Sequence, residues 1–281
     1  MSILTYLARR YVAGEDRADA IKVARALNQY GIAATLDNLG ENVKTSEEAE
    51  LSVKEYLSLL GDIASAGVDA AVSLKLTHLG LDLSDELAYE NARRIIRSAH
   101  GYGNFVRFDM EGSAYTQRTI DILLRLRQEL PNVGCALQTS LLRTQADAAR
   151  LTDNGASIRL VKGAYKEPPS VAFKDKKDVD DNYSAIMKEI LMRGNMPAIA
   201  THDERLINEA TRFALENKID KGSFEFEMLL GIKRALQKRL ADEGRRVRVY
   251  VPYGKNWLPY MMRRLRERKE NILFVVKNIF D

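Results

Sequence analysis

The sequence predicts a (β/α)8 barrel, and three observations support this fold class. Short apolar segments rich in β-forming residues alternate with longer amphipathic segments, which is typical of βαβ units with parallel pairing. The alternation repeats eight times within 281 residues, close to the usual length of this barrel. A doubly wound sheet should carry a glycine-rich turn that opens a helix, but Gly101 and Gly103 precede a strand-like segment instead. We therefore expect one barrel domain over residues 1–281, with a short additional N-terminal helix within about residues 1–30 that leads into it.

The expected strands are short runs of apolar and β-branched residues. In chain order they cover residues 32–36, 71–76, 105–110, 134–139, 157–162, 197–202, 223–228 and 247–252. The expected helices have apolar side chains three or four positions apart, which places these side chains on one face. In chain order they cover residues 19–30, 47–66, 85–100, 115–130, 144–154, 181–193, 204–217, 232–243 and 256–268. The longest irregular stretch, residues 163–180, includes the charge run 174–178 and is expected at the barrel mouth, where it could act as a lid.

Composition excludes several classes of protein. The net charge of +4 permits anion binding, but this excess of basic residues is too small to indicate nucleic-acid binding. Cys135 is the single cysteine, so a disulfide framework and a zinc cluster are excluded, and we expect a buried thiol in a reducing cytoplasm. The histidines lack metal-ligand spacing, so no metal is expected. No apolar run reaches the length of a membrane span, which leaves at most peripheral membrane contact.

Polar residues end or follow the expected strands, on the side of the barrel where active sites form. They are Lys75, Arg107, Asp109, Gln138, Arg159, Lys162, Thr201, His202, Asp203, Glu225, Glu227, Tyr250 and Tyr253. Burying one such charge alone costs several kcal/mol, so we expect mutual pairing and a charged ligand to compensate for the burial.

Three of these positions, and Gly163 next to Lys162, have more than one interpretation. Lys75 is either an inward cation for an anion or a Schiff base, or a salt-bridge partner of Asp109. Asp109 is correspondingly a base or a charge partner. Gly163, just after a strand, either lets a phosphate or a flat ring approach the backbone or only forms a turn. His202 is either a ligand contact or a satisfied histidine at the rim.

The segment around residue 260 indicates a small organic acid as ligand. On a helix, Tyr260, Arg263 and Arg264 occupy positions i, i+3 and i+4 and share one face. Two guanidiniums can bind a carboxylate bidentately, and the tyrosine ring adds an apolar wall. We call Arg263 and Arg264 the carboxylate clamp. The alternative is that Arg263 pairs with Glu267 on an exposed helix face.

Several motifs in a fixed order extend from Arg10-Tyr-Val-Ala-Gly-Glu15 almost to the end of the chain. The others are Val72-Ser-Leu-Lys-Leu-Thr77, Val106-Arg-Phe-Asp-Met-Glu111, Arg159-Leu-Val-Lys-Gly-Ala-Tyr165, Ala200-Thr-His-Asp203, Phe224-Glu-Phe226 and Tyr260-x-x-Arg-Arg264. Together they closely resemble the bacterial monofunctional proline dehydrogenases. The resemblance implies a distorted (β/α)8 barrel that binds FAD without a Rossmann domain, in agreement with the missing glycine-rich turn.

The resemblance also implies roles for single residues. Arg263 and Arg264 would bind the carboxylate of L-proline with help from Lys75. The proline ring would pack against Leu229, Tyr250 and Tyr260. The catalytic residues would be Asp109, which holds the charge network, and Arg159, which lies near the reactive N5 edge of FAD. The cofactor-binding residues would be Met110, Gln138, Arg159, Lys162, Gly163, Ala164, Tyr165, Thr201 and His202.

The implied activity is oxidation of L-proline to 1-pyrroline-5-carboxylate by hydride transfer from C5 to FAD N5, the first step of proline catabolism. Electrons would pass to a membrane quinone, from a cytoplasmic protein that contacts the inner face of the membrane peripherally if at all. Two positions depart from the family pattern, with Ser140 in place of an aromatic residue and Glu227 in place of glutamine. Two alternatives stay open: a Schiff-base aldolase using Lys75 or Lys162, and a non-catalytic barrel that binds small acids.

Overall fold

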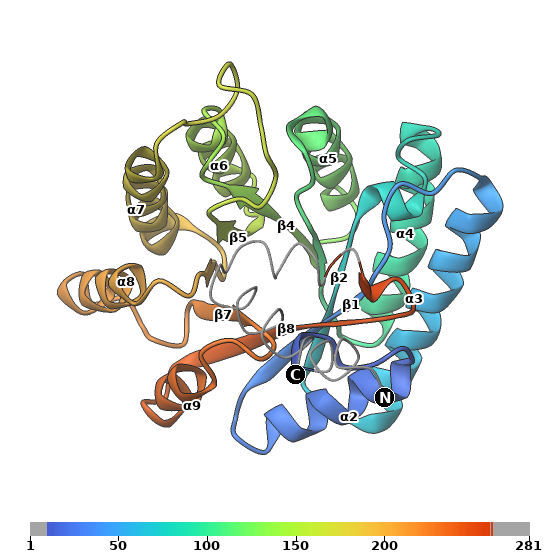
Figure 1. The fold of residues 1–281 in the computed structure, drawn as a ribbon, viewed down its shortest axis with the longest axis horizontal. Coiled ribbons are helices and arrows are strands. Elements are labelled where there is room, and N and C mark those ends of the chain that lie inside the picture. The colour runs from blue at the N-terminus through green and yellow to red at the C-terminus, as the bar shows by residue number, and fades with distance from the viewer. Residues whose placement is uncertain (1–9, 259, 261–281) are drawn as a thin grey trace, which may run out of the picture.

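The computed structural model describes residues 10–258 and residue 260. Eight parallel strands form a closed barrel in which neighbours in sequence pair and β8 pairs with β1 (Figure 1). The strands are β1 (Ala33–Asn38), β2 (Ala70–Leu74), β3 (Val106–Phe108), β4 (Val133–Gln138), β5 (Ser157–Val161), β6 (Ala198–Ala200), β7 (Glu225–Leu229) and β8 (Arg246–Tyr253). The predicted (β/α)8 barrel is therefore confirmed, and each expected strand is present with slightly shifted bounds.

A ring of helices surrounds the strands (Figure 1). They are α2 (Arg17–Asn28), α3 (Ser46–Ala66), α4 (Asp85–Gly101), α5 (Ser113–Arg127), α6 (Thr144–Asp153), α7 (Lys176–Arg193), α8 (Glu204–Glu216) and α9 (Arg234–Asp242). Each of α3 to α9 follows a strand, whereas α2 precedes β1 and contacts both β1 and β8. The helix α2 therefore covers the seam where the barrel closes. Across residues 10–258, the structure has no helix with the length and apolar character of a membrane span.

Two features of the helices differ from expectation. The helix α7 begins at Lys176 and not at residue 181, so part of the charge run forms its first turn and the preceding loop ends earlier. Asp178 in that turn is favourable near the positive end of the helix dipole. A short 3-10 helix, η1 (Leu76–Leu79), follows β2 and was not expected. The expected helix 256–268 lies largely outside the described residues.

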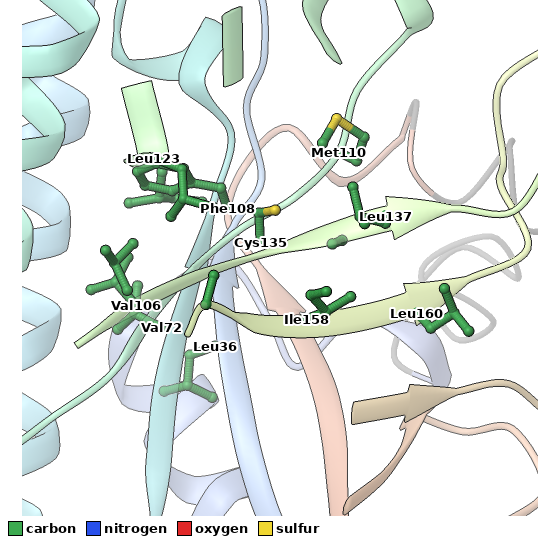
Figure 2. Packing of buried hydrophobic residues seen from close by; sticks show 14 of the residues in the cluster. Leu36, Val72, Val106, Phe108, Met110, Leu123, Cys135, Leu137, Ile158 and Leu160 are labelled. Carbon is green, nitrogen blue, oxygen red and sulfur yellow. The ribbon is translucent and has the colours of Figure 1, made fainter. Parts of the chain in front are cut away.

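The apolar side chains of the strands face the surrounding helices. The register pairs Leu36 with Val72 and Val72 with Val106, so these side chains lie on one face of the sheet. Figure 2 shows them with Leu123 of α5 and Cys135 of β4, and all are buried. Burial raises the pKa of the Cys135 thiol to about 12, so this cysteine is a small apolar core residue, as the sequence predicts.

The other face of the strands lines the barrel interior, and its side chains are largely polar. Arg159 on β5 donates to Ser73 Oγ on β2 at 3.1 Å, and these two strands are not neighbours. The contact therefore runs across the interior. Ala136 and Ala198 are the register partners of Arg159 on the adjacent strands, and their small side chains leave room for its guanidinium.

Candidate active site at the mouth of the barrel

A cavity of 1230 Å³ opens at the carboxyl ends of the strands. Every candidate substrate- or cofactor-binding residue named from the sequence lines this cavity, apart from Arg263 and Arg264, which lie outside the described residues. Pockets for small ligands usually measure about 300–1,000 Å³. The cavity therefore has room for a large cofactor together with a small substrate.

Asp109 is the centre of the hydrogen-bond network in this cavity. Ser73 Oγ and Arg159 Nη1 donate to its Oδ1 at 2.6 and 2.9 Å. Lys75 Nζ and Tyr250 OH donate to its Oδ2 at 3.2 and 2.7 Å. Burial works to raise the pKa of Asp109, but Lys75, Arg159 and the hydrogen bonds lower it to about 2. Asp109 is therefore ionised near neutral pH but only weakly basic, and this low basicity favours the charge-partner interpretation over the general-base one.

Lys75 lies between two carboxylates. Its Nζ is 3.3 Å from Asp37 Oδ2 and 3.2 Å from Asp109 Oδ2. Burial works to lower the pKa of Lys75, but Asp37 and Asp109 outweigh it and raise this pKa above its ordinary value. A Schiff-base lysine needs a lowered pKa, so these contacts disfavour the aldolase alternative. Asp37 was missed from the sequence because the expected first strand ends at Leu36, one residue too early.

The Arg159 guanidinium is held on two sides by carboxylates. Its Nη1 donates to Asp109 at 2.9 Å, and its Nε lies 2.5 Å from Glu227 Oε2. The Tyr250 ring lies 5.4 Å from the Arg159 central carbon, a cation–π contact. Arg159 Nη2 is buried and has no hydrogen-bond partner within residues 10–258 and 260. Arg159 Nε also has no hydrogen bond in the described residues, so its contact with Glu227 is an ion pair alone, and Nη2 stays available beside the cavity.

The ion pairs inside the barrel form one continuous series of alternating charges, which we call the charge chain. It runs in the order Asp37, Lys75, Asp109, Arg159, Glu227, Arg107, Glu225 and Arg248. Four cations and four carboxylates alternate, so their formal charges cancel. Of the residues expected at the mouth, Arg107 and Glu225 do not line the cavity and lie deeper in the barrel. Arg248, which continues the series at that depth, was not named from the sequence.

Gln138, Gly163 and Ala164 form one wall of the cavity. Gln138 Nε2 donates to the carbonyl of Glu111 at 2.9 Å, and the Ala164 N–H donates to Gln138 Oε1 at 3.4 Å. Gly163 has a φ of 119°, and a Cβ at this position would lie 2.3 Å from Ser140 Oγ. Only glycine fits this backbone, and it leaves the main chain open to close approach by a flat group. The wall therefore suits the flavin contacts that the resemblance implies.

Ser140, one of the two departures from the family pattern, lies beside this wall and not on the cavity surface. Its N–H donates to the carbonyl of Lys162 at 2.8 Å, and its own carbonyl accepts from the Phe173 N–H at 2.8 Å. Both contacts use the backbone, so they do not depend on the serine side chain. The serine hydroxyl instead occupies the space against Gly163.

His202 is fixed by a backbone contact. The Leu229 N–H donates to His202 Nε2 at 2.9 Å, so in the neutral ring the proton is on Nδ1. Thr201 Oγ1 accepts from the Asp203 N–H at 3.1 Å. His202 is thus a hydrogen-bonded rim histidine that also lines the cavity, and its contact with a ligand stays a prediction.

Four charged residues at the outer edge of the cavity form a second network, which we call the rim cluster. Lys162 Nζ lies 2.6 Å from Asp180 Oδ1 and 3.0 Å from Asp203 Oδ2. Arg205 Nη2 lies 2.9 Å from Asp180 and 3.0 Å from Asp203. Only Lys162 was named from the sequence as a binding residue. Asp180 was missed because it was assigned to a loop, where a charge run usually means a solvated surface.

The aromatic residues after β8 divide between two environments. Tyr253, expected among the polar strand ends at the mouth, is buried and donates to Glu55 on α3 at 3.0 Å, so it points away from the cavity. Tyr260 is buried in a small cluster with Tyr11 and Ile232 and lines the cavity. The cavity wall of Met110, Tyr165 and Tyr260 adds apolar surface to the charged floor.

A closed parallel barrel with a charge-paired network beside a large cavity at its mouth defines an enzyme of the (β/α)8 class that acts on a small charged molecule. The chain belongs to the proline dehydrogenase family, because the family model described as proline dehydrogenase matches residues 20–277.

Similar proteins agree with this assignment. Proline dehydrogenase 1 of Bacillus subtilis (strain 168) is 42% identical over 272 residues, which cover 97% of this chain and 90% of that protein. Proline dehydrogenase of Deinococcus radiodurans is 43% identical over 278 residues, with the same coverage of 97% and 90%. Proline utilization A from Bdellovibrio bacteriovorus, in a crystal structure inactivated by N-propargylglycine, superposes with a TM-score of 0.87 at 25% identity. That match covers 93% of this chain and 32% of the larger protein.

Proposed function

We propose that this chain is an FAD-dependent proline dehydrogenase that oxidises L-proline to 1-pyrroline-5-carboxylate. Membership of the family supports proline oxidation, the first step of proline catabolism, as its activity. The observation that carries the site is the single cavity lined by every described candidate residue. Its volume suits a flavin nucleotide with a small amino acid beside it.

The substrate end of the cavity combines a fixed cation with aromatic walls. Lys75 is held protonated by Asp37 and Asp109, so it can attract the proline carboxylate together with the proposed clamp of Arg263 and Arg264. Tyr250 is oriented by its hydrogen bond to Asp109, which presents its ring as a wall for the pyrrolidine. Cations close to the amine lower its pKa and favour the neutral form that oxidation requires.

The cofactor end is formed by the wall of Gln138, Gly163 and Ala164 and by Arg159. FAD, when bound, supplies the acceptor for the hydride that leaves C5 of proline. Arg159 contributes a fixed positive charge and a spare N–H donor, which stabilise negative charge that develops beside it. The rim cluster and the exposed Lys176 and Lys177 of α7 supply polar and cationic groups for a diphosphate at the outer edge.

We further propose a membrane quinone as the electron acceptor, reached by peripheral contact of a cytoplasmic protein. The quinone acceptor is inferred only from the resemblance of the sequence motifs to those of the family. Incubation of the proline-reduced protein with a soluble quinone analogue should restore the oxidised flavin spectrum, and failure with every quinone tried would remove this acceptor.

A spectroscopic experiment tests the main proposal. The purified protein should be yellow, and anaerobic addition of L-proline should bleach its visible flavin absorption. A colourless protein that cannot be reconstituted with FAD would contradict the proposal. A colourless protein that still binds proline analogues without turnover would favour the non-catalytic small-acid barrel.

A further inference from the structure

Glu227 lies where the charge chain reaches the cavity. It is on β7, is 3% exposed and lines the cavity. Its Oε2 is 2.5 Å from Arg159 Nε, on the opposite side of the guanidinium from Asp109. Two carboxylates and the Tyr250 ring thus surround Arg159. In the described part of the chain Nε contacts Glu227 as an ion pair without a hydrogen bond, and Nη2 has no hydrogen-bond partner.

The surroundings of Glu227 indicate that its contact with Arg159 is its main interaction. Its second oxygen, Oε1, is buried without a hydrogen-bond partner among residues 10–258 and 260. The other nearby cation, Arg107, is 3.9 Å away through Nε. A buried carboxylate with one close cation gains little net stability from the pair, because desolvation offsets the attraction. Its effect therefore falls on the orientation and effective charge of Arg159.

We infer that Glu227 is a positioning residue for the redox reaction, which fixes Arg159 beside the cavity and reduces the positive charge that Arg159 presents to the flavin. The inference rests on the proposed function, because it concerns a bound flavin. Two-electron reduction places negative charge on the flavin ring. A carboxylate held against the neighbouring cation makes that reduction less favourable, so Glu227 should lower the midpoint potential.

The experiment compares the midpoint potential of bound FAD in the wild type, E227Q and E225Q, by spectroelectrochemical titration of each holoprotein. In E227Q the amide oxygen still faces Arg159 Nε but the negative charge is gone. The equilibrium should shift at least tenfold towards reduced flavin, which is about 30 mV for a two-electron couple. E225Q is the matched control, because Glu225 has the same chemistry on the same face of β7, two residues deeper, and pairs with Arg248 and Arg107 instead. The charge of Glu225 works to raise the pKa of Glu227, so E225Q leaves Glu227 ionised against Arg159. It should shift the equilibrium less than threefold.

Each outcome decides the inference. An unchanged potential in E227Q, or an equal shift in E225Q, overturns it while leaving the proposed function intact. If E227Q does not retain FAD, E227D takes its place. The aspartate side chain is one methylene shorter, so its carboxylate lies farther from Arg159. A shift of E227D in the same direction supports the inference, and a wild-type value overturns it. Absence of flavin from the wild type itself would overturn the proposed function, and this inference with it.

Discussion

Asp109 illustrates how one buried carboxylate can hold the side chains of a candidate site in place without transferring a proton. It accepts hydrogen bonds from Ser73, Lys75, Arg159 and Tyr250, which reach it from β2, the residue after β2, β5 and β8. Its pKa of about 2 keeps it charged at any physiological pH. It therefore acts by fixing the cation and the aromatic ring on which substrate and cofactor are expected to bind.

His78 predicts a specific dependence of stability on pH. Burial, with a smaller contribution from Lys75, lowers its pKa from 6.5 to about 4. As pH falls, His78 binds a proton near pH 6.5 in the unfolded chain but only near pH 4 in the native state. The neutral, buried His78 therefore contributes fully to the free energy of unfolding above pH 6.5, and this contribution is lost as pH falls to 4. The loss corresponds to about 3 kcal/mol. Urea unfolding at several pH values should show this slope in the wild type and not in H78Q. Parallel curves for the two proteins would contradict the prediction.

The carboxylate clamp is a prediction from the sequence that concerns Arg263 and Arg264, outside the described residues. Loss of a charge-assisted hydrogen bond costs about 1.5–3 kcal/mol. Arg263→Ala should therefore raise KM for proline about 10- to 100-fold while FAD stays bound. Lys255→Ala is the control, because this nearby cation is exposed and does not line the cavity. Steady-state kinetics measure both, and an unchanged KM in R263A would remove the clamp.

Single residues were predictable from the sequence where their position within a strand could be counted. Lys75, Arg159 and Tyr250 alternate with apolar neighbours, so their direction into the barrel follows from the period of two. Some of their partners could not be derived, because the contact of Tyr250 with Asp109 depends on how strands far apart in the sequence meet across the interior. Of the two interpretations of Lys75, the salt bridge to Asp109 is present, and its role as a cation for an anion stays a prediction.

At the scale of elements, the turn after β5 is the part of the site whose backbone depends most on a single residue type, glycine at position 163. Gly163 has a φ of 119°, and a Cβ at this position would meet Ser140. The loop that follows is hydrogen-bonded to the start of α5. Glu167 accepts from the Ser113 N–H at 2.7 Å and from Ser113 Oγ at 2.5 Å. The loop is therefore anchored by a helix N-terminus, which supports a stationary wall more than a mobile lid.

Replacement of Gly163 tests this wall. A Cβ in G163A would meet Ser140 Oγ and would require a backbone conformation that costs alanine about 1–3 kcal/mol. We expect destabilisation of that size and at least tenfold weaker FAD binding, measured by quenching of FAD fluorescence. Gly31→Ala is the control, because Gly31 has a φ of 68° and a Cβ there would meet no atom within 4 Å. It should lose stability alone, and equal loss of FAD affinity in both would contradict the prediction.

Element types were predictable from the sequence, whereas some element ends were not. The period of apolar residues identified the strands and the helices α2 to α9. It could not place the start of α7, because Lys176 to Asp178 carry no apolar signal and their helical state depends on the helix that follows. The turn η1 was missed for a similar reason, since Leu76–Leu79 are all buried and show no periodicity.

At the scale of the whole molecule, the charge chain links the closing strands to the site. Arg248 on β8 donates through Nε to both oxygens of Glu225 on β7 at 3.0 Å and through Nη1 to the carbonyl of Ala34 on β1 at 2.7 Å. One side chain thus spans both strands beside the seam. The sequence predicted the barrel but not this interior, because composition cannot distinguish an apolar interior from a charged one.

A double-mutant cycle tests the contribution of this pair. R248M leaves Glu225 buried with only the distant contact to Arg107, so the free energy of unfolding should fall by about 3–5 kcal/mol. The double variant E225Q/R248M removes both charges of the pair, so neither is left buried alone. Its loss in free energy of unfolding should therefore be smaller than the sum of the losses of the two single variants. Urea unfolding measures each value, and additive losses would show that the pair is not coupled.

The cancellation of charge within the charge chain has a consequence for how substrate arrives. The rim cluster also balances, with Lys162 and Arg205 against Asp180 and Asp203. A neutral assembly projects only a weak field beyond the Debye length, so it does not accelerate the diffusion of a zwitterion from bulk solvent. These two networks would then contribute little to any dependence of amino-acid capture on ionic strength.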